Sequence, residues 1–152
     1  MSMFSDAGHL ARRFIGSLSR RAPDDTEDRW AESHLLAHEV DLWRRMSNAD
    51  RRHAIMVARR FAAIRTAELE PSCDEPPCHE PPRDEMAAAL LHDVGKIDSG
   101  LGTFGRVAAT VVGPRTRRFR SYHDHERLGA DWLAAGGSTV LTVELVRRHG
   151  PA

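Results

Sequence analysis

The sequence predicts an all-α protein, a compact bundle of about six to seven helices, and three observations support this class. Apolar residues recur at three- and four-residue spacings along most of the chain. Prolines and glycines gather between those stretches. No internal repeat and no strand–turn–helix pattern of a parallel sheet is visible. We therefore expect the 152 residues to form one helical domain, residues 1–152.

The N-terminal part is expected to be helical. Ser5 could cap a first helix over residues 6–20. This segment is amphipathic and rich in arginine, a pattern that also suits a membrane surface or a transit peptide, but Asp6 and its modest apolar face favour a helix docked on the protein. After a loop at residues 21–25, helical patterns resume near Thr26. Their apolar faces are supplied by Trp30, Leu35, Leu36, Val40 and Trp43.

A long helix is predicted next, from Asp50 to about Leu69, with Ser47 or Asn48 as its cap. His53 lies at the edge of the apolar face of this helix. That face carries Ala54, Val57, Ala58, Phe61 and Ala62. Residues 70–84 hold five of the eight prolines, so we predict a loop there.

Three features divide the C-terminal half. A helix resumes at Met86, is apolar on every side through Leu91, and stops at Gly95, so it belongs in an interior. Beyond a glycine-punctuated stretch, a helix is predicted from about Tyr122 to Ala135, closed by Gly136-Gly137. Ser138 could cap a last helix running to His149, although residues 140–143 would also tolerate a strand.

The composition of the chain limits the classes of partner and the location that we expect. Acidic and basic residues balance at 22 each, which gives no reason to expect binding to nucleic acid. The two cysteines form no disulfide framework, so a reducing cytoplasm is the expected location. No apolar run is long enough for a membrane span, and no secretory signal is evident. A homodimer is an open alternative to a monomer.

His92 and Asp93 directly follow the interior helix and are the first candidates for chemistry. Burying a carboxylate beside an imidazole is costly unless a cation or a hydrogen-bonded partner compensates. The alternative is a pair at a helix end that is solvated or bonded to backbone. Helical spacing also places His125 and His149 on inward faces of their helices, whereas His123 points elsewhere. The alternative to a role in chemistry is that His125 and His149 are core histidines whose nitrogens are satisfied by hydrogen bonds.

Three segments resemble the HD superfamily of metal-dependent phosphohydrolases. Leu90-Leu91-His92-Asp93-Val94-Gly95-Lys96 is similar to its HD-[IV]-G-K signature. The segment from Arg52 to Ala58, which contains His53, resembles the upstream H-x-x-x-V-A element. His125 to Ala130 is similar to the H-x-x-x-G-A element of HD domains that hold a second metal. The resemblance covers residues 48–150 and implies an HD-like core there. Residues 1–47 are expected to form a helical extension packed on this core, but they could equally form a dimer surface.

The resemblance implies a site for a divalent metal ion, which could be Mn, Fe, Zn or Mg. Its ligands would be His53, His92 and Asp93, with His125 and His149 as further candidates. Asp93 and Lys96 would be catalytic, and Lys96 would contact a substrate phosphate. Lys96 is the single lysine among the basic residues. Its alternative role is that of an ordinary charge at a helix C-terminus.

A second group of cations could receive the other phosphates of a nucleotide, although a solvated loop is the plainer interpretation. It consists of Arg115, Arg117, Arg118 and Arg120. Cys73, Cys78 and His79 look superficially like a zinc element, but three ligands in a proline-rich loop are a weak signal.

Two departures from the family pattern matter. No aspartate follows Asp131, whereas family members supply a final one, and Arg148 stands where the first histidine of a pair is expected. Either Asp124, Asp131 or a partner chain supplies the missing ligand, or the site is incomplete.

Three hypotheses follow. The chain could be a phosphohydrolase or phosphodiesterase acting on a nucleotide or another small phosphate ester. It could instead be a degenerate, non-catalytic HD domain that binds a nucleotide or serves as a regulatory or interaction module. It could also be a fragment of a longer reading frame.

Overall fold

The structure is a computed structural model that describes residues 21–69, 81–99, 116 and 124–148. Every regular element within these ranges is a helix, which confirms the predicted all-α class. The helices are α2 (Asp25–Ser33), α3 (Ala37–Arg45), α4 (Asn48–Leu69), α5 (Arg83–Leu91), α6 (Lys96–Ser99), α9 (His125–Gly136) and α10 (Val140–Arg147). The helix predicted over residues 6–20 lies outside the described residues.

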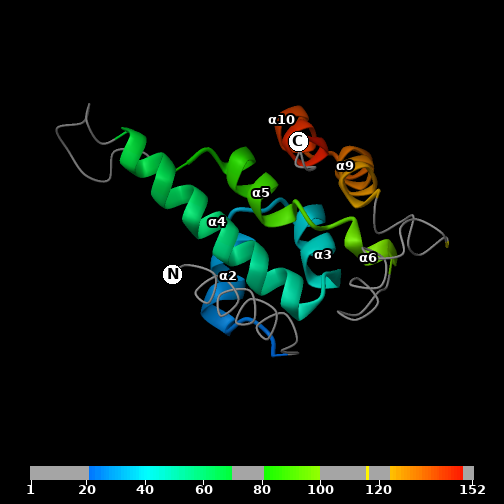
Figure 1. The fold of residues 1–152 in the computed structure, drawn as a ribbon, viewed down its shortest axis with the longest axis horizontal. Helices are drawn as coiled ribbons and strands as arrows, with labels where there is room; N and C mark the ends of the chain where they lie inside the picture. The colour runs from blue at the N-terminus through cyan, green and yellow to red at the C-terminus, as the bar shows by residue number, and fades with distance from the viewer. Residues whose placement is uncertain (1–20, 70–80, 100–115, 117–123, 149–152) are drawn as a thin grey trace, which may run out of the picture.

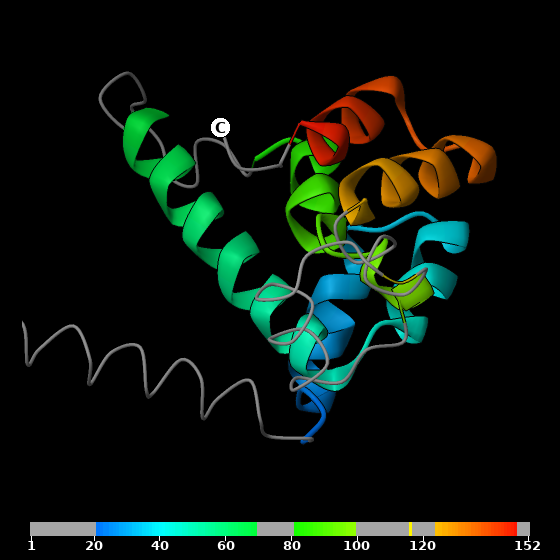
Figure 2. The ribbon, with the colours of Figure 1, turned by 45° about the vertical axis from the view of Figure 1, so that its right-hand side comes forward.

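Helix α5 is the centre of the arrangement. It packs against the long helix α4 on one side and against α10 on the other (Figure 1). Helix α10 packs on α9, which in turn contacts α3 and the short helix α6. Figure 2 shows the same order after rotation, with α4 on one side of α5 and the α9–α10 pair on the other. In the described part of the chain, we find no helix with the length and apolar character that crossing a membrane requires.

The central position of α5 follows from its residues 86–91, which are apolar all round. Its buried residues are Met86, Ala87, Ala88, Leu90 and Leu91, as the predicted interior helix requires. All of these except Ala87 belong to one apolar cluster that also includes Ala31 of α2, Trp43 of α3 and Leu133 of α9. The two N-terminal helices therefore share the core of the later ones.

Short polar side chains set two of the helix starts. Asp24 accepts a hydrogen bond from the backbone N–H of Glu27 at 2.8 Å and so begins α2. Ser47 accepts one from the N–H of Asp50 at 3.2 Å, which confirms Ser47 as the cap of α4.

Both predicted ends of α5 are wrong by a few residues. The loop predicted for residues 70–84 is too long, because α5 begins at Arg83, where the carbonyl of Pro82 accepts the N–H groups of Glu85 and Met86. The α-helix also ends at Leu91, before Gly95. From there the backbone makes hydrogen bonds of three-residue span, including that from the N–H of Lys96 to the carbonyl of Asp93 at 3.0 Å. The chain thus turns sharply just where the candidate residues lie.

The C-terminal helices are shifted slightly from their predicted bounds. Helix α9 begins at His125 rather than near Tyr122, and it ends at the predicted glycines, with Gly137 in the left-handed region at φ 92°. Helix α10 excludes the alternative of a strand at residues 140–143. Its cap is Thr139, which accepts the N–H of Thr142 at 3.3 Å, and not Ser138 as predicted.

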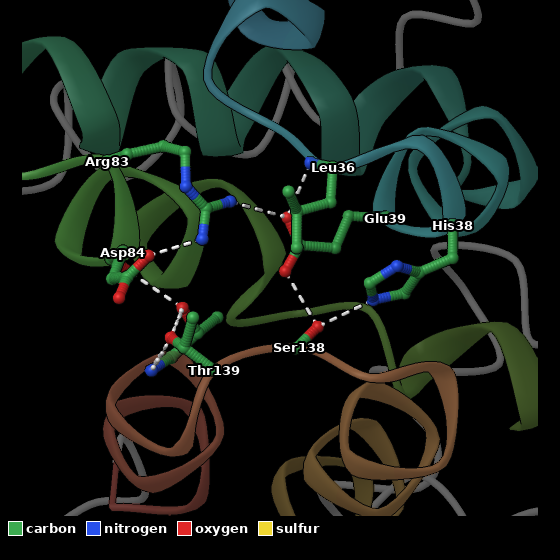
Figure 3. A network of polar contacts seen from close by, with 8 residues as sticks. Leu36, His38, Glu39, Arg83, Asp84, Ser138 and Thr139 are labelled. Carbon is green, nitrogen blue, oxygen red and sulfur yellow. Dashed lines mark hydrogen bonds and ion pairs between the residues drawn. The ribbon is translucent and has the colours of Figure 1, made fainter.

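Ser138 instead belongs to a buried polar network around Glu39 (Figure 3). Glu39 is fully buried and accepts hydrogen bonds from the Ser138 hydroxyl at 2.6 Å and from the Leu36 N–H at 2.8 Å. Arg83 pairs with the same carboxylate at 3.3 Å and also contacts Asp84. One side chain of α3 thereby holds the first residue of α5 and the α9–α10 junction, so the network fixes the start of the helix that carries the site at its other end.

Candidate metal centre

His53, His92 and Asp93 come together at the C-terminal end of α5. His53 lies in the second turn of α4 and is partly buried, and α4 packs directly on α5. His92 and Asp93 follow the last residue of α5 and are each 4 % exposed. The side chains of these two neighbours reach the same site, although adjacent residues of a helix point about 100° apart.

The backbone of α5 orients the His92 ring. Its Nδ1 lies 2.8 Å from the carbonyl oxygen of Ala89, which can only accept a hydrogen bond. Nδ1 therefore carries the proton, and Nε2, which lies 3.5 Å from Oδ2 of Asp93, faces the site. A histidine whose second nitrogen is held in this way is arranged as metal-ligating histidines usually are.

The spacing of the three residues fits a single cation. One candidate ligand atom from each of them lies within 4.8 Å of the others. Ligands that lie about 2.1 Å from one ion are about 3.4 Å apart in a tetrahedral arrangement, so closure needs a shift of up to about 1.4 Å. The rings of His53 and His92 meet edge to face, with their centroids 5.5 Å apart. Two imidazoles and a carboxylate suit Mn, Fe or Zn.

Asp93 is surrounded by positive or proton-bearing groups. Lys96 Nζ lies 2.6 Å from Oδ1, and Nε2 of His125 lies 3.6 Å from the same oxygen. Burial alone would raise the pKa of Asp93, but the contacts with His125 and His92 and the charge of Lys96 outweigh it. The pKa of this carboxyl is held well below its usual range, so Asp93 is ionised and can serve as a ligand.

The two histidines of the set differ in charge. Burial lowers the pKa of His53, and the charge of Asp93 only partly opposes this effect. Burial also acts to lower the pKa of His92, but the hydrogen bond and the charge of Asp93 outweigh it and raise that pKa above its ordinary value. Of the two rings, His53 therefore loses its proton at the lower pH and His92 at the higher pH.

Glycines bring α9 to this site. A Cβ atom placed on Gly129 would lie 2.9 Å from Cγ1 of Val94 and 3.1 Å from the backbone nitrogen of Gly95. Only glycine lets the first turns of α9 approach the His92–Gly95 turn so closely. The approach carries His125 to Asp93. It also brings Glu126, whose Oε1 lies 3.5 Å from Nε2 of His125 and which the sequence reasoning did not single out.

The remaining predicted residues fall elsewhere. Asp124 and Asp131, suggested as replacements for the missing ligand, are exposed and pair with Arg127 at 3.9 and 3.3 Å. Arg148 is exposed and pairs with Glu144 at 3.1 Å. The other candidates lie outside the described residues: Cys73, Cys78, His79, Arg115, Arg117, Arg118, Arg120, His123 and His149.

Comparisons of the chain with protein-family models, with curated proteins and with solved structures found no match.

Proposed function

We propose that this protein is a metal-dependent phosphohydrolase or phosphodiesterase of the HD type, acting on a nucleotide or another small phosphate ester. The observation that carries the proposal is the convergence of His53, His92 and Asp93 from two helices onto one partly buried point. Three protein ligands leave positions open for water and substrate, which is the arrangement of a catalytic rather than a structural ion. The cysteine usage of the sequence supports a cytoplasmic location.

Each residue would have a defined task. His53 and His92 would supply neutral nitrogen ligands and Asp93 a charged oxygen ligand. A bound divalent ion would supply Lewis acidity toward a phosphoryl oxygen and a water of lowered pKa. Lys96, whose ammonium already lies at the site, would hold a non-bridging oxygen of the phosphate. His125, beside Asp93, is placed to receive or deliver a proton.

The metal content of the purified protein tests the proposal first. Elemental analysis of the native chain is expected to give close to one Mn, Fe or Zn per chain, and Asp93→Asn and His92→Ala are expected to lose it. Asp98→Ala is a matched control because Asp98 is an exposed aspartate nearby in sequence. A native protein that stays folded but takes up no added cation would refute the proposed site.

Activity tests the chemistry. A panel of nucleotides and an aryl phosphodiester should be hydrolysed only with metal, and turnover should stop on addition of a chelator. Turnover that is unchanged in Asp93→Asn would place the reaction elsewhere on the chain.

One observation favours a second candidate, a degenerate HD domain that binds a nucleotide without hydrolysing it or serves as a regulatory or interaction module. Arg148, which stands where the family pattern has a histidine, is exposed and engaged with Glu144 rather than with the site. This candidate predicts metal or nucleotide binding that is abolished by Asp93→Asn, together with no turnover of any substrate in the panel. Chelator-sensitive hydrolysis by the native chain would exclude it.

A further inference from the structure

Lys96 forms an ion pair with the carboxylate of Asp93, which a metal ion would need as a ligand. Its ammonium lies 2.6 Å from Oδ1 of Asp93, the shortest contact of that carboxylate among the described residues. The side chains of Lys96 and Asp93 are only 17 % and 6 % exposed, so water screens this pair poorly. The lysine thus neutralises a buried negative charge that would otherwise be costly.

A divalent ion at the centre defined by His53, His92 and Asp93 would take over that neutralisation. The ion would lie about 2.1 Å from an oxygen of Asp93. The ammonium bound to the same carboxyl group would then lie within a few ångströms of a doubly positive charge, in surroundings that screen weakly. The hydrogen bond between Lys96 and Asp93 is therefore favourable in the metal-free chain and opposed by repulsion in the metal-bound one.

We propose that Lys96 is an internal counter-ion that leaves Asp93 when the metal binds, and that this release makes its ammonium available to a phosphate anion. The inference rests on the proposed function and adds an order of binding to it, with the cation first and the anion second. In the metal-free chain the lysine is engaged with Asp93, so the anion lacks its partner.

Thermodynamic reciprocity gives this arrangement a measurable consequence. If metal binding strengthens phosphate binding by releasing Lys96, phosphate must strengthen metal binding by the same factor. A lysine that only contacted phosphate, and never competed for Asp93, would leave the affinity for the metal alone unchanged when it is replaced. The two roles of Lys96 can therefore be separated without measuring catalysis.

The first experiment observes Lys96 directly. It is the only lysine in the sequence, so protein grown with isotopically labelled lysine has a single labelled side chain in NMR spectra. Zn²⁺ is added without phosphate. We expect the terminal methylene and ammonium signals to move from those of an immobilised, ion-paired lysine to those of a solvated one, and phosphate then to shift them again.

The second experiment measures Mn²⁺ affinity in Lys96→Met, with and without inorganic phosphate. Without phosphate, we expect this variant to bind Mn²⁺ about tenfold tighter than the native chain, within the usual range of coupling energies. Phosphate should tighten Mn²⁺ binding to the native chain and have little effect on the variant. Lys96→Arg keeps a cation beside Asp93 and should stay close to native.

Arg127→Met is the matched control for the loss of one positive charge. Arg127 lies two residues from His125 but is 62 % exposed and pairs with Asp131, not with Asp93. Its replacement should leave Mn²⁺ affinity within about threefold of native, because exposed charges are well screened. A general electrostatic effect would instead change the Mn²⁺ affinity of both variants by the same factor, and this result would overturn the inference.

Two different results would separate the counter-ion role of Lys96 from the metal site itself. Cation binding that leaves the lysine signals unmoved, with equal Mn²⁺ affinity in Lys96→Met and native protein, would overturn the counter-ion role while the metal site stood. Absence of cation binding by the folded native chain and by every variant would refute the metal site itself and the inference with it.

Discussion

Gly95 lies directly against the backbone of His125, so closely that a Cβ atom on Gly95 would be 1.8 Å from the carbonyl oxygen of His125 and 2.7 Å from its carbonyl carbon. No side-chain rotation can relieve such an overlap, because both partners are backbone. The glycine therefore sets the distance between the turn that carries His92 and Asp93 and the first residue of α9. Through this contact the chain places a third histidine beside the candidate ligands.

Gly95→Ala is expected to separate α9 from the turn. Overpacking of this kind costs about 1–3 kcal/mol and occasionally more, and backbone contact places this case at the upper end. We expect a loss of about 3 kcal/mol in the free energy of unfolding, measured by urea denaturation, and weaker binding of the metal.

Gly137→Ala is the comparison for this prediction. Its φ of 92° strains any side chain, but nothing lies within 4 Å of its Cβ position. A cost of about 1 kcal/mol from backbone strain alone is expected, with metal affinity unchanged. Equal effects of the two substitutions would show that the Gly95 contact does not position the site.

The three candidate ligands could be chosen from the sequence, and the surroundings that the structure gives them could be predicted only in part. His92 and Asp93 follow an apolar helix and His53 stands at the edge of another, and these local patterns survive because burial of the two helices brings them together. The place of Lys96 against Asp93 depends on how the chain turns after Leu91, which helical periodicity does not describe. Glu126 carries no distinguishing signal, since an acidic residue in a first helical turn is ordinary.

The predicted ends of helices were wrong where contacts between residues far apart in the sequence determine them. Arg83 reads as part of a charged, proline-rich loop, but its guanidinium pairs with Glu39 of α3 and so belongs to the folded core. Ser138 has the character of a cap, yet its hydroxyl donates to Glu39 and leaves the capping role to Thr139. Both errors have the same origin, because nothing in the sequence marks Glu39 as a buried carboxylate.

Glu39→Ala should be among the most destabilising single substitutions in the chain. It would leave the Leu36 N–H without its acceptor and the Arg83 guanidinium, which is 34 % exposed, with Asp84 as its remaining partner, and a buried donor that loses its acceptor typically costs about 1–3 kcal/mol. Ser138→Ala removes one hydrogen bond to the carboxylate and should cost about 2 kcal/mol. Urea denaturation measures both, with Glu39→Gln as the variant that retains an acceptor if Glu39→Ala does not fold.

Glu32→Ala serves as the control for Glu39. Glu32 pairs with Arg44, which is 61 % exposed, and exposed ion pairs contribute little to stability. The control should unfold at nearly the native urea concentration. A Glu39→Ala protein as stable as this control would mean that the network in Figure 3 does not hold the helices together.

His125→Ala tests whether that residue is a ligand or an outer partner. Its Nε2 contacts Asp93, but the residue is not part of the three-residue set. Loss of an outer partner commonly weakens metal binding by about 10- to 100-fold without changing how many ions bind. We expect this result by titration with a competing chelator, with His34→Ala near native. Loss of one of two bound ions would instead make His125 a ligand of a second metal.

Metal binding should release a proton, and the number released should fall as the pH rises. Asp93 raises the pKa of His92 and burial lowers that of His53, so in the metal-free chain His92 is the ring that keeps its proton to the higher pH. A ligand nitrogen must be deprotonated, so the ion displaces the proton of His92. Above the raised pKa of His92 the ring is already neutral and no proton remains to be displaced.

Calorimetric titrations with Mn²⁺ in two buffers of different ionisation enthalpy count these protons. The number of protons released per ion is expected to fall as the pH rises through the pKa of His92, and the metal Kd should rise by up to about tenfold per unit as the pH falls below that pKa. Protons lost from a metal-bound water would follow the opposite trend, because their release increases with pH. Release that grows with pH would therefore assign the proton to water, and His92 would then not be protonated in the metal-free site.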